Sequence, residues 1–257
     1  MLALLAQLAS AERNPRANAE RAAEAIAGHP QADLAVFPEL YLSGYTMNGL
    51  DELARSADAP ELRLIAEAAA RASTAVVVGF PERREGGRPA NAAACIDRDG
   101  SLAAVYRKTQ LFGAEEDAFE PGEELMIVEL AGTRVGPLVC FDVEFPETAR
   151  QLGLAGAELV AVASANMDPF YVDHEVATRA RAVENRLPLV YANAVGDLDG
   201  LTFVGGSRSV APSGEILAEA AEGTERLLLA PVAEPGDVDE RVDYLRHLPG
   251  ELRVTNP

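Results

Sequence analysis

The chain has 257 residues and a mass of 27.2 kDa, and 48% of its residues are hydrophobic. It contains 22 Lys and Arg residues and 41 Asp and Glu residues, which gives a formal net charge of −19 at pH 7. This acidic balance argues against nucleic acid or an anionic membrane as a partner, because both require a cationic surface. No apolar run approaches the ~20 residues of a membrane span, and the N-terminal segment lacks the basic region of a signal peptide. We therefore expect one soluble globular domain in the cytoplasm.

The first eighty residues alternate between strand-like and helical patterns, which is typical of α/β folds. The predicted strands are 2–9, 34–40 and 74–80, and the predicted helices are 14–29 and 61–72. The first helix begins with an asparagine N-cap and a proline and ends at a glycine, and these residues favour those positions.

Hairpins join this alternation in the rest of the chain. Two hairpins are predicted at 91–108 and 124–141, each around a turn that contains glycine, and the segment 202–232 is also hairpin-like. The other predicted elements are helix 146–156, strand 158–165, helix 173–186 and strand 187–195. The stretches rich in proline and glycine have the length of loops, so the sequence predicts one domain, 1–257, with two roughly similar halves.

Cys140 ends the apolar run of the stretch GPLVCFDVEFPE, where a predicted strand turns into a helix. A cysteine in that place is exposed as a nucleophile, and the free N–H groups of the turn can hold an oxyanion. A free thiol has a pKa of ~8.5 and needs a base or a cation to react. No histidine lies near Cys140 or Cys95 in the sequence, and His174, between two acidic residues, is expected to be solvated. A Cys–His pair, a metal site and a disulfide are therefore disfavoured, and Cys95 is expected in the core.

Two charged residues occupy the ends of other predicted strands. Lys108 is the only lysine of a chain that otherwise uses arginine, which suggests a role that the planar guanidinium cannot fill, such as a bond to a single oxygen. The alternative is an ordinary surface lysine. Glu39 lies between the apolar runs LAVFP and LYL, and a buried glutamate must be paired or act as a base. Both possibilities fit a Glu39 that lies near Cys140 and Lys108.

Glutamate, lysine and cysteine at three strand ends, in this order, resemble the nitrilase, or carbon-nitrogen hydrolase, superfamily. The matching motifs span nearly the whole chain: FPELYLSGY around Glu39, YRKTQLFG around Lys108, VCFDVEFPE around Cys140, ANM at 165–167, TRARAVEN at 178–185, YAN at 191–193 and GGSRSVAPSG at 205–214. The resemblance implies a four-layer-forming α-β-β-α sandwich that assembles as a homodimer or as multiples of dimers. It also implies cleavage of an amide, nitrile or carbamoyl group without a cofactor.

The resemblance assigns a role to each matching residue. Cys140 is the nucleophile that forms an acyl-enzyme, and Glu39 is the general base, first for the thiol and then for water. Lys108 and the backbone N–H of Phe141 stabilise the tetrahedral oxyanion.

The family's additional glutamate follows the lysine shortly afterwards. Glu115 is favoured by its spacing to the Pro-Gly pair at 121–122, and Glu116 is the alternative. The C-terminal segment 240–257 mixes apolar and charged residues, and we expect it to pack at a subunit interface.

The residues around Cys140 also bear on the substrate. Relatives that cleave N-carbamoyl amino acids carry an arginine for the substrate carboxylate three or four positions after the cysteine, where this chain has Val143 and Glu144. Because a glutamate repels a carboxylate, this departure weighs against carbamoyl amino acids and dicarboxylic acid monoamides. Within the family the motifs CFDVEFPE, KTQLFG and ANM are most similar to bacterial aliphatic amidases such as 5-aminopentanamidase and the R-stereoselective amidases. This predicts the hydrolysis of a small linear or cyclic-amine carboxamide to a carboxylic acid and ammonia.

Several alternatives remain open at this point. An N-carbamoyl-amine hydrolase is the second candidate, and a non-catalytic binding protein is disfavoured because all three triad residues are present. The acidic charge indicates either a solubilising surface or a pocket for cationic substrates, and Glu144 either faces that pocket or pairs with an arginine of the following helix region. Tyr45, Phe112, Asn166 and Met167 are candidates for the pocket wall, with core or turn roles as the alternative.

Overall fold

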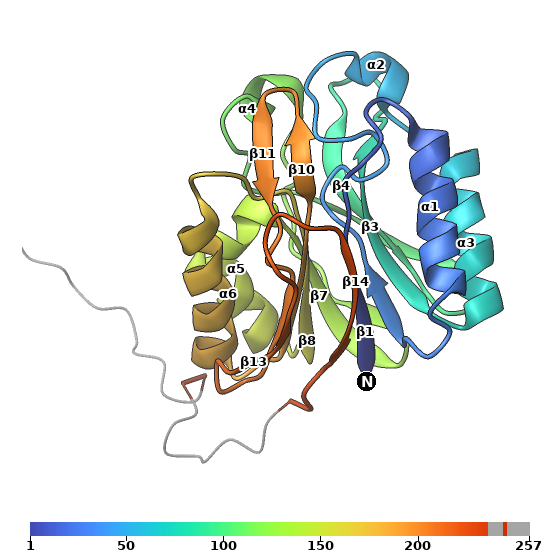
Figure 1. Cartoon of the computed structure of the whole chain (residues 1–257). Coiled ribbons are helices and arrows are strands. Elements are labelled where there is room, and N and C mark those ends of the chain that lie inside the picture. The colour runs from blue at the N-terminus through green and yellow to red at the C-terminus, as the bar shows by residue number, and fades with distance from the viewer. Residues whose placement is uncertain (236–243, 246–257) are drawn as a thin grey trace, which may run out of the picture.

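The computed structural model describes residues 1–235, 244 and 245. Two six-stranded sheets pack face to face, and a pair of helices covers the outer face of each sheet (Figure 1). This α-β-β-α sandwich confirms the predicted fold class.

The first sheet has the strand order β14-β1-β2-β3-β4-β5. β1, β2 and β3 are parallel, and the remaining neighbours pair antiparallel. Its strands are β1 (Leu2–Gln7), β2 (Leu34–Val36), β3 (Ala75–Glu82), β4 (Ala90–Ile96), β5 (Leu102–Arg107) and β14 (Arg226–Pro231).

The second sheet has the order β13-β12-β9-β8-β7-β6 and repeats this plan. β7, β8 and β9 are parallel, with antiparallel strands on both sides. Its strands are β6 (Val128–Leu130), β7 (Thr133–Val139), β8 (Leu159–Ser164), β9 (Leu189–Asn193), β12 (Arg208–Val210) and β13 (Ile216–Glu219). Three central parallel strands in each sheet agree with the two similar halves expected from the sequence.

Four longer helices form the outer layers, and shorter elements gather at one end of the sandwich (Figure 1). The longer helices are α1 (Pro15–Ala27), α3 (Pro60–Ala72), α5 (Pro146–Leu154) and α6 (Tyr171–Asn185). The shorter elements are α2 (Leu50–Leu53), α4 (Glu115–Ala118), the 3₁₀ helix η1 (Cys140–Glu144) and the hairpin β10 (Val195–Leu198) and β11 (Leu201–Val204). As predicted, α1 is capped by Asn14, whose side chain accepts a hydrogen bond from Ala17 N.

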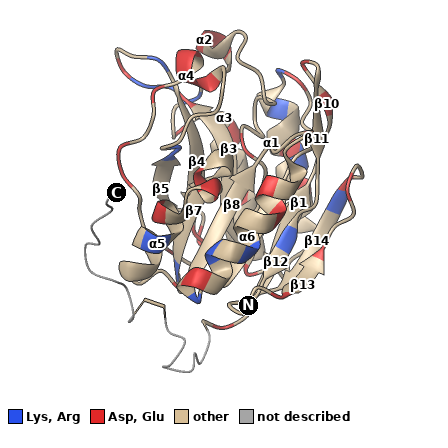
Figure 2. Ribbon diagram, turned by 90° about the vertical axis from the view of Figure 1, so that its left-hand side faces the viewer, with Lys and Arg blue, Asp and Glu red and all other residues tan. Residues whose placement is uncertain are grey.

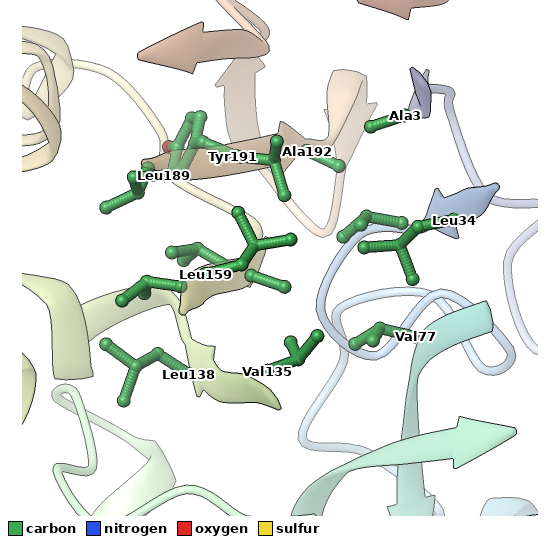
Figure 3. Packing of buried hydrophobic residues seen from close by; sticks show 14 of the residues in the cluster. Ala3, Leu34, Val77, Val135, Leu138, Leu159, Leu189, Tyr191 and Ala192 are labelled. Atoms are coloured by element: carbon green, nitrogen blue, oxygen red, sulfur yellow. The ribbon is translucent and has the colours of Figure 1, made fainter. Parts of the chain in front are cut away.

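The alternation of side chains along each strand explains the layers. In β1, Ala3 and Leu5 belong to the core between the sheets, whereas Leu4 and Ala6 pack with residues of α1 and α3. Successive side chains of a strand point to opposite faces, so a fully apolar strand can be buried on both sides. Figure 3 shows part of the core between the sheets, with Leu34 and Val77 facing Val135 and Leu159.

The fold differs from the prediction in the last third of the described chain. The hairpin-like segment 202–232 is divided, because β12 and β13 stay in the second sheet while β14 crosses to pair with β1. The predicted strand 187–195 ends at Asn193, and the hairpin of β10 and β11 follows. Its tip, Asp199-Gly200, is a hairpin signal that predicts this pair once it is noticed.

The remaining expectations concern the acidic residues, membrane spans and the C-terminal segment. Acidic residues are distributed over several elements, including α2, α4 and α6 (Figure 2). Within the described residues, no helix combines the length and the apolar character needed to cross a membrane. The predicted interface segment 240–257 lies outside the described residues, except for Tyr244 and Leu245.

Candidate active site

Glu39 lies in the loop after β2, and its position depends on a glycine of the neighbouring strand β3. A Cβ atom on Gly79 would lie 2.3 Å from the Pro38 carbonyl oxygen and 2.6 Å from the Glu39 Cα atom. Only glycine lets two backbone segments approach this closely. Gly79 N donates to Pro38 O at 3.2 Å, and Glu39 N donates to Ser164 O at 3.3 Å. The loop is thus held from both sheets, and Glu39 is 2% exposed.

Lys108 follows β5 and lies between two buried carboxylates. Its Nζ donates to Glu39 Oε1 at 2.6 Å and to Glu115 Oε2 at 2.7 Å, and all three side chains are fully buried. Glu116 is exposed. Of the two glutamates that the sequence left open, Glu115 is therefore the one that lies beside Lys108.

Asn91 and Tyr45 complete this cluster of charges. Asn91 Nδ2 donates to Glu39 Oε1 at 2.7 Å, and the Tyr45 hydroxyl donates to Glu115 Oε1 at 2.8 Å. Asn91 was not predicted from the sequence, although it is a polar residue near the start of β4, directly before the apolar run AAAC. A polar residue in a buried strand needs a hydrogen-bond partner, and that was the available signal.

Cys140 stands at the end of β7, where the strand passes into η1. Its backbone φ is 45°, in the left-handed region that costs a non-glycine residue about 1–2 kcal/mol. The N–H of Phe141 lies at the start of the turn, where N–H groups have no acceptor within a helix. This geometry suits the predicted oxyanion role of Phe141, which stays a prediction.

Asp142 connects the Cys140 turn to the segment after Lys108. Its Oδ2 accepts hydrogen bonds from Val139 N at 3.0 Å and from the Tyr106 hydroxyl at 2.8 Å. Its Oδ1 accepts from the N–H groups of Thr109 and Gln110 and from the Thr109 hydroxyl. Nothing in the sequence alone indicated this role of Asp142, because most of its donors come from another part of the chain.

The protonation states follow from burial and from the neighbouring charges. Burial raises the pKa of Glu39 most strongly, and the charge of Glu115 raises it further. The charge of Lys108 and hydrogen bonds lower it again. The balance is a pKa of about 7. Burial lowers the pKa of Lys108, but the charges of Glu39 and Glu115 outweigh this effect and raise it above its ordinary value. Burial, followed by the charge of Glu39, raises the pKa of the Cys140 thiol well above its usual range. The resting cluster therefore has a neutral thiol, a cationic lysine and a glutamate that can exchange a proton near neutral pH.

Cys140 lines a narrow pocket with a cavity volume of about 20 Å³. This is far below the ~300–1,000 Å³ of typical ligand sites, so the side chains around Cys140 leave space for a small group. The lining residues are Tyr45, Phe112, Cys140, Phe141, Glu144, Asn166, Met167, Phe170 and His174.

All five residues predicted for the pocket wall are among these lining residues. Phe170 was missed; its ring centroid lies 5.5 Å from that of Phe112, a contact between segments far apart in the sequence. Asn166 also has the turn role that was left open, because its side chain bonds the backbone of Met167 and Phe170.

His174 corrects the expectation of a solvated histidine, because it is only 2% exposed. The buried residues of α6 recur at helical spacing, and His174 lies on this face. They are His174, Ala177, Thr178, Arg181, Ala182 and Asn185. The helical period, and not the two acidic neighbours, was the correct signal.

Glu144 does not pair with an arginine of the following helix region. Its Oε1 lies 3.0 Å from Nε2 of His174. Arg181 instead donates to the backbone oxygens of Val143 at 2.9 Å and Glu144 at 2.8 Å. The side chain of Glu144 therefore remains part of the pocket wall.

Comparison with known proteins places this arrangement in a family. The family model described as carbon-nitrogen hydrolase matches residues 2–235. The chain belongs to the carbon-nitrogen hydrolase family. This carbon-nitrogen hydrolase is similar to an (R)-stereoselective amidase from a Pseudomonas species, with 41% identity over 225 residues that cover 86% of this chain and 81% of the amidase.

Solved structures of an amidase from Nesterenkonia sp. AN1 have the same fold. A glutamate-to-glutamine mutant of that amidase shows covalent addition of the acetamide moiety of fluoroacetamide at its active-site cysteine; it has a TM-score of 0.83 and 31% identity and covers 96% of this chain and 92% of its own. A cysteine-to-alanine mutant in complex with butyramide has a TM-score of 0.84 and 31% identity, with 96% and 93% covered. This carbon-nitrogen hydrolase is therefore a hydrolase that acts on C–N bonds other than peptide bonds.

Proposed function

We propose that this carbon-nitrogen hydrolase is a cysteine amidase that converts a small linear or cyclic-amine carboxamide to a carboxylic acid and ammonia. The observation that carries the proposal is the arrangement at Cys140, which lines the small pocket and lies close enough to Glu39 for each group to shift the pKa of the other. Lys108 donates to the same carboxylate at 2.6 Å. The nucleophile Cys140, the base Glu39 and the cation Lys108 therefore lie close enough together to act on one carbonyl group.

The first half of the proposed reaction forms a thioester and releases ammonia. Cys140 Sγ attacks the amide carbon while Glu39 takes the thiol proton. The negative oxygen of the tetrahedral intermediate is stabilised by Lys108 Nζ and by the N–H of Phe141. Collapse breaks the C–N bond as Glu39 returns the proton to the departing nitrogen, which leaves as ammonia.

The second half consumes water. Glu39 takes a proton from a water molecule as it attacks the thioester carbon, and the same two donors stabilise the oxyanion. The C–S bond then breaks, the thiol regains its proton, and the carboxylic acid is released. In this scheme Glu115 keeps Lys108 protonated and in place.

The small pocket and the acid in its wall support an amine-bearing substrate. Glu144 lies where a carboxylate-binding arginine would stand in relatives that use N-carbamoyl amino acids, and the similar proteins named above are amidases. An N-carbamoyl amine without a carboxylate would not be repelled by Glu144 either, so an N-carbamoyl-amine hydrolase is the second candidate.

The test of the nucleophile compares the two cysteines. Cys140→Ala is expected to abolish ammonia release from 5-aminopentanamide, whereas Cys95→Ala, at a buried core position, keeps turnover. Intact-mass spectrometry of the wild type during turnover should show the acyl group on the protein, and the Cys140→Ala protein should lack it. Ammonia release by purified Cys140→Ala would remove Cys140 from its role.

The test of the reaction class uses a panel of small amides, N-carbamoyl amines and nitriles. We expect ammonia without carbon dioxide, and fastest from amine-bearing amides. Release of carbon dioxide from the carbamoyl amines at a higher rate would favour the second candidate. Faster turnover of a dicarboxylic acid monoamide than of 5-aminopentanamide would contradict the charge argument.

We also propose a homodimer that works in the cytoplasm. Val172 and Val176, one turn apart on α6, are 61% and 59% exposed and are suited to a contact between subunits. The two cysteines are both free, as expected for a reducing compartment. Light scattering on the purified protein measures the assembly directly.

A further inference from the structure

A chain of hydrogen bonds runs from Glu144 in the pocket wall to Ser164, which lies beside Cys140. His174 is its middle member: Nε2 lies 3.0 Å from Glu144 Oε1, and Nδ1 lies 2.9 Å from the Tyr191 hydroxyl. Ser164 Oγ donates to that hydroxyl at 3.0 Å. The proposed reaction uses none of His174, Tyr191 and Ser164, although all three are buried.

The partners of His174 determine the direction of these hydrogen bonds. Burial lowers the pKa of His174, and the charges of Lys108 and Arg208 lower it as well, against the opposing effect of Glu144, so the imidazole is neutral and carries one N–H. A carboxylate can only accept, which requires Nε2 to be the donor to Glu144. Nδ1 then accepts from the Tyr191 hydroxyl, which holds the ring in this tautomer.

Because His174 is a neutral donor, it can orient the Glu144 carboxylate without cancelling its charge, whereas an arginine would cancel it. Within residues 1–235, 244 and 245, His174 is the only basic side chain recorded within ion-pair distance of the Glu144 carboxylate. Arg181 anchors the backbone of the same turn and pairs with Glu184 at 2.6 Å. The carboxylate is therefore oriented without being neutralised. The side chain of Glu144 is still 29% exposed, and the residue lines the pocket.

We propose that His174 is a positioning residue for substrate specificity: it holds the Glu144 carboxylate so that its full negative charge faces the ammonium group of the substrate, and Tyr191 fixes the tautomer that makes this possible. The inference rests on the amine-bearing amide of the proposed function. Without the donor, the flexible glutamate side chain turns toward solvent, and the pocket loses its preference for a cation.

The experiment compares two amides of equal length that differ in charge. 5-Aminopentanamide carries an ammonium group where hexanamide carries a methyl group, so the ratio of their kcat/KM values isolates the charge. In His174→Leu this ratio is expected to fall at least about tenfold, the usual size of a lost charged hydrogen bond, mainly because KM rises for the charged amide. His174→Gln, which retains an N–H donor, should restore part of the ratio, and Tyr191→Phe should lower it less than His174→Leu.

His29→Asn is the matched control. His29 lies just after α1, and its ring Nδ1 is 2.8 Å from Ala25 O, so both substrates should react as with the wild type. If His174→Leu does not fold, as judged by circular dichroism, the ratio of Tyr191→Phe decides: a reduced ratio supports the proposal and an unchanged ratio overturns it.

Three results distinguish a failure of the proposed function from a failure of the positioning role of His174. A wild type that does not prefer 5-aminopentanamide to hexanamide refutes the amine-bearing substrate of the proposed function. A wild type with that preference, together with a folded His174→Leu protein of unchanged ratio, refutes the positioning role alone. An equal loss of both substrates in His174→Leu also refutes it, because that pattern indicates general structural support.

Discussion

At the scale of single residues, one lysine lies between two buried carboxylates. Lys108 can neutralise only one of Glu39 and Glu115, and burial disfavours the remaining charge. The cost falls on Glu39, whose pKa is raised to about 7. A carboxylate with this affinity for a proton is far better matched to a thiol and to ammonia than an exposed glutamate is.

The first prediction is a pH dependence of kcat/KM in the wild type. The raised pKa means that Glu39 is protonated below about pH 7 and cannot take the thiol proton, so the rate should fall as the pH is lowered through this value. Glu39→Gln should lose about 10²–10⁴-fold in rate. Steady-state ammonia assays between pH 5 and 9 measure both effects.

The control for this prediction is Glu116→Gln, at an exposed acid on α4, which should keep the wild-type profile. An acidic limb centred near pH 4 would contradict the assignment, because it would indicate a glutamate with an ordinary pKa.

At the scale of elements, the active site is assembled from turns that are held by residues outside the proposed triad. Gly79 lets the Glu39 loop lie against β3, and Asp142 joins the turn after β7 to the segment after β5. Each connects a turn to a different strand, so a substitution at either position shifts one member of the cluster relative to the others.

Asp142→Asn tests the connection between the two turns. Both oxygens of Asp142 accept hydrogen bonds, but the asparagine side chain has an NH₂ group in place of one oxygen. The buried donors that faced this oxygen then have no acceptor. We expect the free energy of unfolding to fall by about 2–3 kcal/mol and kcat to fall at least about tenfold, since Cys140 and Lys108 lose their common anchor. Urea unfolding and ammonia assays measure the two effects. Asp99→Asn, in an exposed turn, should change little; equal effects of the two substitutions would contradict the anchoring role.

Gly79→Ala tests the close approach of the Glu39 loop. The added Cβ would lie 2.3 Å from Pro38 O, so the loop must move away from β3, at a cost of about 1–3 kcal/mol in unfolding free energy. A displaced Glu39 should also lower kcat. Gly153→Ala in α5 is the control, because the added Cβ would make ordinary contacts of 3.5 to 3.6 Å and alanine favours a helix; this substitution should be neutral or stabilising. A Gly79→Ala protein with unchanged kcat would show that the loop tolerates the shift.

At the scale of the whole molecule, the core that stabilises the sandwich lies apart from the catalytic candidates. The largest core lies between the two sheets (Figure 3), whereas the catalytic candidates follow the C-terminal ends of β2, β5 and β7. Leu159 opens β8, and Ser164 at the site lies five residue steps further along the strand, a distance of about 16 Å.

Leu159→Ala is therefore expected to change stability without changing the reaction. Leu159 is fully buried, and its truncation should lower the unfolding free energy by about 2–5 kcal/mol, while kcat well below the melting temperature stays close to that of the wild type. Leu154→Ala, at a residue of α5 that is 55% exposed, should change the unfolding free energy by less than about 0.5 kcal/mol. A strong loss of kcat in folded Leu159→Ala would indicate that the core and the site are coupled.

Much of this protein follows from its sequence alone. Local periodicity and turn residues predicted most strands, the four longer helices and the α/β class, because these signals arise within short segments. The positions of Glu39, Lys108 and Cys140 at strand ends followed from the same patterns, and the family motifs supplied their roles, which remain predictions.

The tertiary structure decided what depends on contacts between distant segments. It distinguished Glu115 from Glu116, buried His174 against Glu144 and Tyr191, and brought Asn91 and Asp142 to the cluster. The physical reason is that burial and hydrogen-bond partners, unlike periodicity, are properties of the packed molecule, and these two properties determine the protonation state and orientation of the groups at the site.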